Sequence, residues 1–302
     1  YRAAGVNRLS FGIQSFDDDA LTRLGRIHDS AEAERAVKMA QDAGFDNVNI
    51  DLMYALPGQT LAGAEADLQR AFALQPAHLS HYQLTLEPNT VFFARPPQGM
   101  PDEDSAWDIQ EHCQVLIAEA GFQHYEVSAY ARPGRQSAHN LNYWRFGDYL
   151  GIGAGAHGKI SSGAGQHVQR RWKLKHPQAY MDSAGTPENL GGDELIDSTR
   201  LPFEYMLNLL RLHEGFTLSD FESRTGLARS AIASPLRQAL AKGWLEQVGG
   251  GPAEATGQAR AHSAEDHDCT ATGCHAQPEL ILRPTELGRR FTNDVVELFL
   301  PG

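Results

Sequence analysis

The sequence has few cysteines, no long apolar run and no excess of positive charge. Its 302 residues include only three cysteines, an odd number that excludes a disulfide scaffold and is typical of a reducing compartment, so we expect a cytoplasmic protein. No window approaches the about 18 uninterrupted apolar residues of a membrane span, which leaves at most a peripheral membrane contact. The formal net charge of −12 argues against nucleic acid as a partner.

What the sequence does contain, over residues 1–96, is an alternation of strands and helices. The predicted order is strand 6–14, helix 29–43, strand 47–55, helix 60–74 and strand 78–86. Asp29 followed by Glu32 makes a capping box for the first long helix. This rhythm is typical of βαβ units and predicts an α/β fold with a parallel sheet.

The pattern changes after residue 96. A helix at 104–120, a strand at 125–130 and a Gly-rich stretch to 158 are predicted in an α+β region that covers 97–196. From 197 to 302 the predicted elements are helices 200–213, 217–225 and 229–242, strands 244–248 and 280–282, and a helix 284–300. Three helices and a hairpin predict a winged-helix-like domain, whose wing contains a flexible insert, 249–278.

Winged helices often bind DNA, but the charge of this one argues against it. Residues 200–248 hold six Arg or Lys and five Asp or Glu, so there is no basic stripe.

Polar residues stand where the predicted parallel strands end. They are Gln14 in GIQSF, Asp51 in NIDLMYALPGQ, and Thr85 and Glu87 in QLTLEPN. In an α/β barrel the active site lies at the strand ends, so these residues are candidates for a site. A carboxylate such as Asp51 within an apolar strand needs a partner or a ligand, although it could also cap a neighbouring loop. Arg26 could hold a ligand carboxylate or be a solvated surface residue.

Four long blocks of the sequence resemble the HemW-type heme chaperones, relatives of oxygen-independent coproporphyrinogen III dehydrogenase within the radical SAM superfamily. The blocks are GVNRLSFGIQSFDDDALTRLGRIHD, NVNIDLMYALPGQT, HLSHYQLTLEPNT and HNLNYWRFGDYLGIGAGAHG. The likeness covers essentially the whole chain except residues 249–278. It implies a partial radical SAM (β/α) barrel, made of the later strands only, over residues 1–96.

The resemblance also implies a pocket for S-adenosylmethionine. In that family the Gln of GxQxF, the Arg about twelve residues later and the Asp of NIDL line this pocket, which here are Gln14, Arg26 and Asp51. The chemistry agrees, because the ligand offers a carboxylate suited to Arg, and an ammonium and ribose hydroxyls suited to Asp and Gln. Thr85 and His157 would also approach the cofactor.

The block HNLNYW matches the HNxxYW signature of the HemW-type proteins, and it includes Asn140. The resemblance implies that heme binds here, with His139 as the axial ligand of the iron and Tyr143 and Trp144 as flat aromatic surface. Arg145 would pair with the heme propionates. A histidine near aromatic residues is, however, often a structural one.

Gly153, Gly155 and Gly158 satisfy a GxGxxG pattern. The segment KISSG that follows is not a helix, so a dinucleotide fingerprint is not predicted. We interpret the glycines as allowing close approach of the backbone to a cofactor, or as a tight turn. His157, in the same stretch, is the next candidate ligand for the heme iron.

The insert 249–278 carries possible metal ligands. They are Cys269, Cys274, His262, His267 and His275. This mix could bind zinc or heme iron, whereas the Gly-, Ala- and Thr-rich composition is typical of a solvent-exposed loop.

A radical SAM cluster needs three thiolates in the motif CxxxCxxC, and none of the three cysteines fits it; Cys113 stands alone on a predicted helix. In the family this motif lies on the first barrel strand, upstream of everything matched here. We therefore expect an N-terminally truncated chain that lacks roughly 90 to 110 residues, about three βα units, including the [4Fe-4S] ligands. No catalytic residue is assigned in the chain itself.

The leading hypothesis for function is a heme chaperone of the radical SAM family, which binds heme and passes it to an acceptor protein. The alternative is an enzyme, oxygen-independent coproporphyrinogen III oxidase, acting in porphyrin biosynthesis. A cluster-free binding module is a third possibility.

Overall fold

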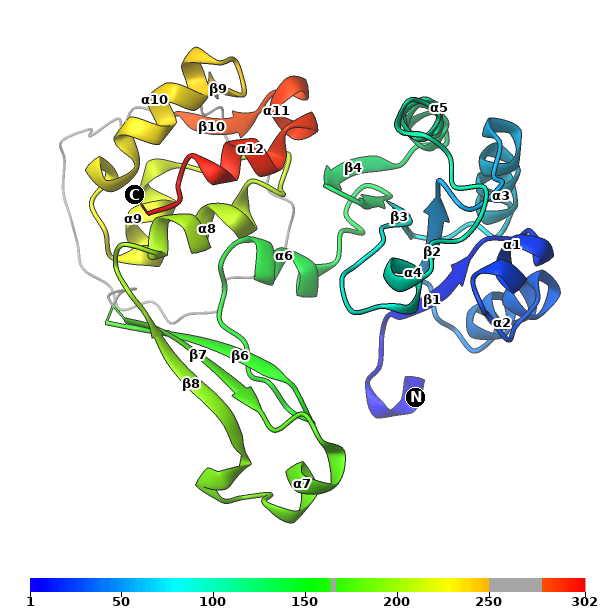
Figure 1. The fold of residues 1–302 in the computed structure, drawn as a ribbon, viewed down its shortest axis with the longest axis horizontal. Coiled ribbons are helices and arrows are strands. Elements are labelled where there is room, and N and C mark those ends of the chain that lie inside the picture. Colours follow the sequence, from blue (N-terminus) through cyan, green and yellow to red (C-terminus); the bar gives the residue numbers. More distant parts are fainter. Residues whose placement is uncertain (164–166, 250–278, 302) are drawn as a thin grey trace, which may run out of the picture. The chain divides into compact units, whose positions relative to one another are not determined.

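The computed structural model describes residues 1–163, 167–249 and 279–301. Internal contacts divide the chain into two units, Tyr1–Ser137 and Ala138–Gly302, and each is described by itself (Figure 1). The three-part division at residues 96 and 196 stays a prediction.

Five strands form one sheet in the first unit, in the order β1-β2-β3-β5-β4. They are β1 Leu9–Gln14, β2 Val48–Tyr54, β3 His78–Gln83, β4 Gln123–Glu126 and β5 Ala129–Ala131. The strands β1, β2 and β3 run parallel, which confirms the predicted βαβ arrangement. β5 pairs antiparallel with both β3 and β4. The single strand predicted over 125–130 is therefore wrong: the chain reverses between Glu126 and Ala129.

The helices of the first unit begin at polar caps. They are α1 Asp18–Arg23, α2 Ser30–Asp42, α3 Leu61–Ala73, α4 Val91–Ala94 and α5 Glu103–Glu119, after a short 3-10 helix η1 Arg2–Ala4. The capping box of Asp29 and Glu32 is formed at α2, as predicted. The Thr60 hydroxyl accepts a hydrogen bond from the Gly63 amide at 3.1 Å and starts α3.

The core of the first unit lies between one face of the sheet and three helices. Ile50 and Leu52 of β2 are fully buried, and they share a hydrophobic cluster with Val37 of α2, Leu68 of α3 and Ile117 of α5. Because side chains alternate along a strand, the residues between them belong to the opposite face. The first unit thus forms an open sheet with helices on one side, which is the arrangement expected of part of a (β/α) barrel wall.

A three-stranded antiparallel sheet follows the helix α6 Ala138–Trp144 in the second unit. Its strands are β6 His157–Ser162, β7 His167–Lys173 and β8 Leu190–Ile196, and the connection from β7 to β8 contains α7 Pro177–Asp182 and η2 Pro187–Asn189. This sheet was not predicted from the sequence, which indicated only a non-helical segment after Gly158.

The rest of the second unit is mainly helical and confirms the winged-helix-like arrangement of helices and hairpin. Its elements are α8 Leu201–Leu209, α9 Leu218–Thr225, η3 Arg229–Ile232, α10 Ala233–Ala241, β9 Leu245–Val248, β10 Ile281–Pro284, α11 Glu286–Arg290 and α12 Thr292–Glu297. The single helix predicted over 284–300 is divided at Phe291, whose backbone leaves the helical region (φ −110°, ψ 35°). Residues 250–278, most of the predicted insert, lie outside the described residues.

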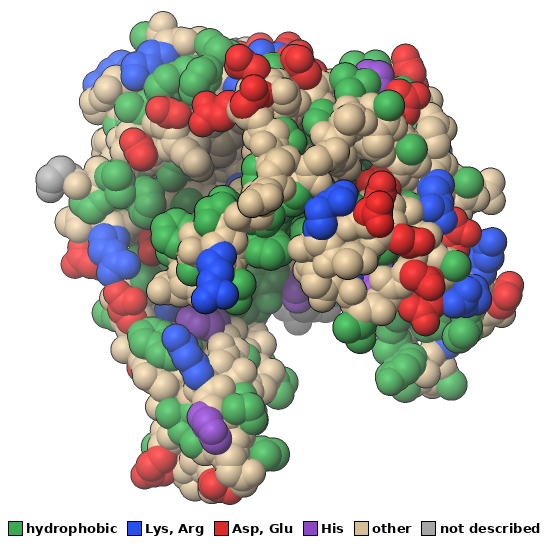
Figure 2. All heavy atoms as spheres, turned by 45° about the vertical axis from the view of Figure 1, so that its right-hand side comes forward, with side chains coloured by type: hydrophobic (Ala, Val, Ile, Leu, Met, Phe, Trp, Pro, Cys, Tyr) green, Lys and Arg blue, Asp and Glu red, His purple; other side chains and the backbone are tan. Residues whose placement is uncertain are grey.

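Acidic and basic side chains are interspersed over the face drawn in Figure 2. None of the helices in the described part of the chain has the length and apolar character needed to cross a bilayer.

Candidate functional site

The face of the first unit's sheet opposite the helices carries polar side chains. They are Ser10 and Gln14 on β1, Asn49 and Asp51 on β2, and His78, Ser80 and Tyr82 on β3. Hydrogen bonds join these side chains across the strands, which places them on one face. Two residues that the sequence singled out, Gln14 and Asp51, therefore belong to the same polar surface.

Gln14 is held at the end of β1 in an unusual backbone conformation. Its φ is +72°, a left-handed value that costs a non-glycine residue of order 1 kcal/mol. The side chain is buried, folds back over Gly12, and accepts a hydrogen bond at Oε1 from the Tyr82 hydroxyl at 2.8 Å. A Cβ at Gly12 would lie 2.7 Å from Gln14 Nε2, so a larger residue there would push the Gln14 amide out of this position.

Tyr82 interacts with three of the predicted cofactor residues. Its hydroxyl donates a hydrogen bond to Gln14, and the charges of Asp51 and Arg26 act on its pKa. Burial and the charge of Asp51 raise this pKa, whereas the charge of Arg26 lowers it. Both charged groups therefore act on the same hydroxyl. The sequence analysis missed Tyr82, although its place two residues after Ser80 in an alternating strand was the available signal.

Asp51 rests on a buried polar network. The Asn49 amide donates to Asp51 Oδ1 at 2.6 Å, and Asn49 Oδ1 lies 2.6 Å from His78 Nδ1. Since an amide oxygen only accepts, His78 Nδ1 carries the proton and Nε2 accepts from the Tyr125 hydroxyl at 2.7 Å. Burial, with a smaller effect of Arg8, lowers the pKa of His78 to about 3, so the ring is neutral.

The donor set suits S-adenosylmethionine. The Asp51 carboxylate is partly exposed and forms no ion pair with a described residue, so it can accept from an ammonium or from hydroxyls. The Arg26 guanidinium is exposed and makes no side-chain hydrogen bond or ion pair within the described part of the chain, so it can bind a carboxylate.

The other two predicted cofactor residues lie elsewhere. Thr85 follows the end of β3, and its hydroxyl donates to Glu87 at 3.0 Å in a separate small pocket. His157 belongs to the second unit, where it is the exposed first residue of β6 and stacks on Trp172 at 6.0 Å between ring centroids.

The HNLNYW block forms α6, of which no residue is fully buried. His139 is exposed and meets the ring of Tyr143 edge-on, with 4.7 Å between centroids. Tyr143 lies in turn 4.3 Å from Tyr149. These three rings, which we call the α6 aromatic cluster, place an accessible imidazole beside flat aromatic surface; Asn140 is partly exposed on the same helix.

Two hydrogen bonds of Asn142 hold the turn that follows α6. The side-chain amide of Asn142 donates to the Asp148 backbone carbonyl at 2.9 Å, and the Asn142 backbone carbonyl accepts from the Gly147 amide at 2.7 Å. The chain therefore turns back on α6 directly after it ends. Tyr149, a residue that the sequence analysis did not single out, becomes a neighbour of Tyr143.

Trp144 and Arg145, also predicted to contact heme, already have partners in the second unit. Trp144 packs against the helical core, and the guanidinium of Arg211 lies 4.4 Å from the centre of its ring. Arg145 forms an ion pair with Glu214 at 2.8 Å. Either residue would have to exchange a contact to bind a ligand.

The glycines of the GxGxxG pattern contact the chain's own backbone. Gly158 lies within strand β6, which confirms that no helix opens there. A Cβ at this position would lie 3.1 Å from the Gly151 amide nitrogen. Gly153 and Gly155 have φ values of +116° and +69°, as in a tight turn.

The residues that the structure describes do not fit a [4Fe-4S] cluster. Cys113 is the one cysteine among the described residues, and burial raises the pKa of its thiol to about 12, which keeps it protonated. The described residues contain no group of three or more His, Cys, Asp or Glu placed to hold a metal ion. The predicted metal ligands lie outside the described residues; they are Cys269, Cys274, His262, His267 and His275.

Two family models match the chain: the radical SAM superfamily over residues 1–71 and the HemN C-terminal domain over residues 196–251. The solved structure of coproporphyrinogen III oxidase (HemN) from Escherichia coli, a radical SAM enzyme, superposes with a TM-score of 0.71 at 21% identity. It covers 99% of this chain and 65% of that one. At this identity the likeness shows the fold, and it confirms the radical SAM-type architecture.

Curated relatives are closer in sequence. The heme chaperone HemW of Escherichia coli K12 is 48% identical over 247 residues, which are 82% of this chain and 64% of the relative. HemW of Buchnera aphidicola subsp. Acyrthosiphon pisum is 34% identical over 300 residues, 99% of this chain and 70% of the relative. The chain thus spans about two thirds of the length of these relatives, and it belongs to the HemW family of the radical SAM superfamily.

Proposed function

We propose that this protein binds heme and passes it to an acceptor protein in the cytoplasm, as a heme chaperone. The name of its relatives supports this, and one structural observation carries it. His139 is exposed on α6 beside Tyr143 and Tyr149. An imidazole nitrogen is a common axial ligand of heme iron, and aromatic rings offer the flat apolar surface that a macrocycle needs.

We further propose that the polar surface of the first unit binds S-adenosylmethionine. Arg26 would take its carboxylate, and Asp51 its ammonium or ribose hydroxyls. Gln14, fixed by Tyr82, would offer a positioned amide to the same ligand.

Coproporphyrinogen III oxidase activity is not proposed. Its support is the structural likeness to HemN at 21% identity, which concerns the fold alone.

Heme titration followed in the Soret region tests the chaperone proposal. We expect His139→Ala to shift the Soret band and to weaken heme binding about tenfold or more, since it removes the axial ligand. His167→Ala, another exposed histidine of the second unit, is the matched control and should change neither. His157→Ala tests the other candidate ligand.

Release is tested with excess apomyoglobin, which should draw heme from the loaded protein. The proposal fails if the unaltered protein binds no heme or never releases it. The assignment of His139 fails if its variant binds heme as the control does, or if only His157→Ala loses binding.

A further inference from the structure

Asp67 is a buried carboxylate that the sites proposed above do not include. It lies on α3 and is 4% exposed, beside the buried side chains of Ala64, Leu68 and Ala71 on the same helix. Burying a carboxylate costs free energy unless hydrogen bonds or charges compensate for the loss of water. The groups that bond to Asp67 therefore indicate what it does.

Asp67 holds the turn at which β1 ends. Its Oδ1 accepts a hydrogen bond from the Phe16 amide at 2.6 Å, and its Oδ2 accepts one from the Ser15 hydroxyl at 2.9 Å. Both donor residues are buried, and they directly follow Gln14, whose φ of +72° is strained. Because a strained backbone persists only where its surroundings hold it, Asp67 is placed to fix the conformation of Gln14.

The same helix also holds the other polar group of the Phe16 backbone. Arg70, one turn after Asp67, donates from Nη1 to the Phe16 carbonyl at 2.6 Å. Arg70 is in turn paired with Glu34 of α2 at 2.8 Å. The amide and the carbonyl of Phe16 are thus both bonded to side chains of α3.

Asp67 also reaches the loop that follows β2, the strand that carries Asp51. Gln59 Nε2 donates to Asp67 Oδ2 at 3.3 Å, and Gln59 Oε1 accepts from the Leu56 amide at 3.2 Å. One carboxylate therefore joins the loops after two neighbouring parallel strands, at the edge of the sheet where ligands of such folds bind.

The ionised form of Asp67 is the one that suits these partners. The Phe16 amide, the Ser15 hydroxyl and the Gln59 amide all donate to it, and an ionised carboxylate only accepts. A proton on Asp67 would displace one of these bonds. It would also weaken the others, since hydrogen bonds to an ionised acceptor are the stronger ones.

The surroundings of Asp67 let it take up a proton more readily than an ordinary aspartate does. Burial, the largest effect, raises the pKa of Asp67, and the charge of Asp17 adds to the rise. The hydrogen bonds from the turn after β1 and the charge of Arg70 oppose the rise, but the net shift of the pKa is upward. The thiol of Cys113 on α5 also interacts with Asp67, but burial keeps this thiol protonated and neutral.

We propose that ionised Asp67 is a positioning residue of the S-adenosylmethionine site, which holds the turn after β1 so that Gln14 is presented to the ligand. Protonation of Asp67 would loosen this turn and weaken binding as the pH falls. The inference rests on the proposed binding of S-adenosylmethionine, and it adds a group that makes this binding depend on pH.

Isothermal titration calorimetry with S-adenosylmethionine, between about pH 7 and pH 4.5, compares the unaltered protein with Asp67→Asn. The variant keeps an acceptor of the same shape but cannot ionise, so we expect about fivefold weaker binding at neutral pH. The ratio of the two affinities should approach one as the pH falls, because protonated Asp67 resembles asparagine. His28, whose Nε2 lies 3.1 Å from the Ile13 carbonyl oxygen, is present in both proteins, so its effect cancels in the ratio.

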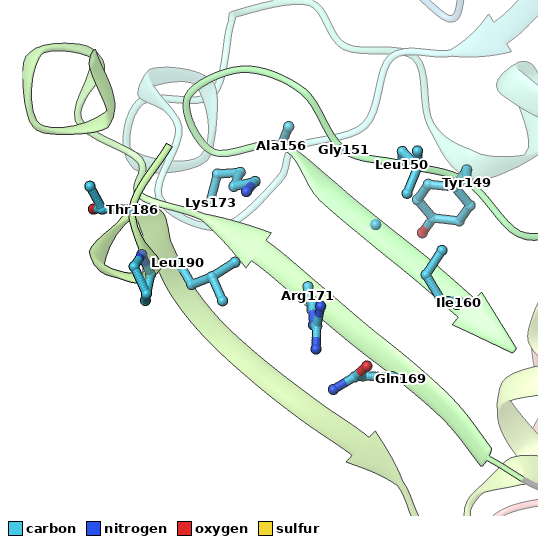
Figure 3. Close-up of a pocket in the computed structure, with 12 residues that line it drawn as sticks. Tyr149, Leu150, Gly151, Ala156, Ile160, Gln169, Arg171, Lys173, Thr186 and Leu190 are labelled. Atoms are coloured by element: carbon cyan, nitrogen blue, oxygen red, sulfur yellow. The ribbon is translucent and has the colours of Figure 1, made fainter. Parts of the chain in front are cut away.

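Asp193→Asn is the matched control, since it makes the same change in a carboxylate of the second unit. Asp193 accepts from Gln169 at 2.6 Å and from Arg171 at 2.9 Å, two side chains drawn at the pocket of the three-stranded sheet in Figure 3. This variant should bind S-adenosylmethionine as the unaltered protein does at every pH.

Nuclear magnetic resonance on the unaltered protein tests the hydrogen bond itself, and it depends neither on the folding of Asp67→Asn nor on a ligand. In protein that contains isotope-labelled phenylalanine, the Phe16 amide signal should shift with pH, with a midpoint above the value of about 3.9 for an ordinary aspartate. Phe16→Leu identifies this signal among those of the 13 phenylalanines. A residue that only supports the fold would not link this titration to the affinity for a ligand.

Three results would overturn the inference while the proposed binding of S-adenosylmethionine stands. They are equal affinities of the unaltered protein and Asp67→Asn at neutral pH, a ratio of affinities that does not change with pH, and a Phe16 amide that does not titrate. If the unaltered protein binds no S-adenosylmethionine, both the inference and the proposed binding fail.

Discussion

The Tyr82 hydroxyl donates a hydrogen bond to Gln14 Oε1 at 2.8 Å, and so ties the end of β1 to β3 across the intervening strand. This hydrogen bond holds Gln14 in place, because a non-glycine residue with a positive φ is strained and needs contacts that fix its conformation. The charges of Asp51 and Arg26 both act on the same hydroxyl. Tyr82 is therefore a positioning residue for the proposed S-adenosylmethionine site.

Tyr82→Phe should weaken S-adenosylmethionine binding about fivefold, since a hydrogen bond of about 1 kcal/mol no longer fixes Gln14. Isothermal titration calorimetry measures the affinity of the protein and of the variant for S-adenosylmethionine. The control is Tyr180→Phe, which removes a tyrosine hydroxyl bonded to the Gly153 amide in the other unit. Equal affinities in the two variants would contradict the role of Tyr82.

Gly12→Ala tests the same geometry from the opposite side. The new Cβ would lie 2.7 Å from Gln14 Nε2, the far end of a flexible side chain that can move away. We expect a loss of less than about 1 kcal/mol in the free energy of unfolding, but several-fold weaker S-adenosylmethionine binding. Urea unfolding and calorimetry on one sample separate the two effects. A large loss of stability with unchanged binding would count against the prediction.

Local patterns predicted the first unit well. The helix α2 starts where Asp29 and Glu32 can form a capping box, and β2 shows its buried residues as an apolar run. Asp51 could be singled out because a carboxylate in such a run needs a partner. These features depend on residues close together in the sequence.

The sequence did not predict features that depend on distant residues. The strand β7, HVQRRWK, has too few apolar residues to alternate visibly, because one of its faces carries Gln169, Arg171 and Lys173. Tyr149 joins the α6 aromatic cluster through a turn that Asn142 fixes, and no periodic pattern encodes such a turn. Likewise, the pairing of Arg145 with Glu214 spans 69 residues.

Two buried histidines predict acid sensitivity. The pKa values of His78 and His81 are each lowered to about 3, chiefly by burial, whereas the unfolded value is about 6.5. Between these values the unfolded chain binds protons that the folded chain does not, so stability falls as pH falls. The expected slope is about 1.4 kcal/mol per pH unit for each histidine.

The variant His81→Phe should reduce this slope by about half, because it keeps a ring against Tyr54, 4.7 Å away, and removes one titrating group. Urea unfolding at intervals between pH 6.5 and 4.5 measures the slope. His167→Gln, at an exposed position, should leave it unchanged. A slope that is the same in His81→Phe and in the unaltered chain would show that His81 does not remain neutral in the folded state.

Gly147→Ala should disrupt the turn that brings Tyr149 to α6. A Cβ there would lie 2.1 Å from Asn142 Oδ1 and 2.7 Å from the Asn142 carbonyl oxygen, which cannot move without losing its bond to the Gly147 amide. We expect a loss of about 1–3 kcal/mol in the free energy of unfolding, typical of overpacking, together with weaker heme binding. Gly249→Ala is the control, since a Cβ at Gly249 meets nothing within 4 Å. If Gly147→Ala were as stable as this control and bound heme normally, the turn would not be what places Tyr149 beside Tyr143.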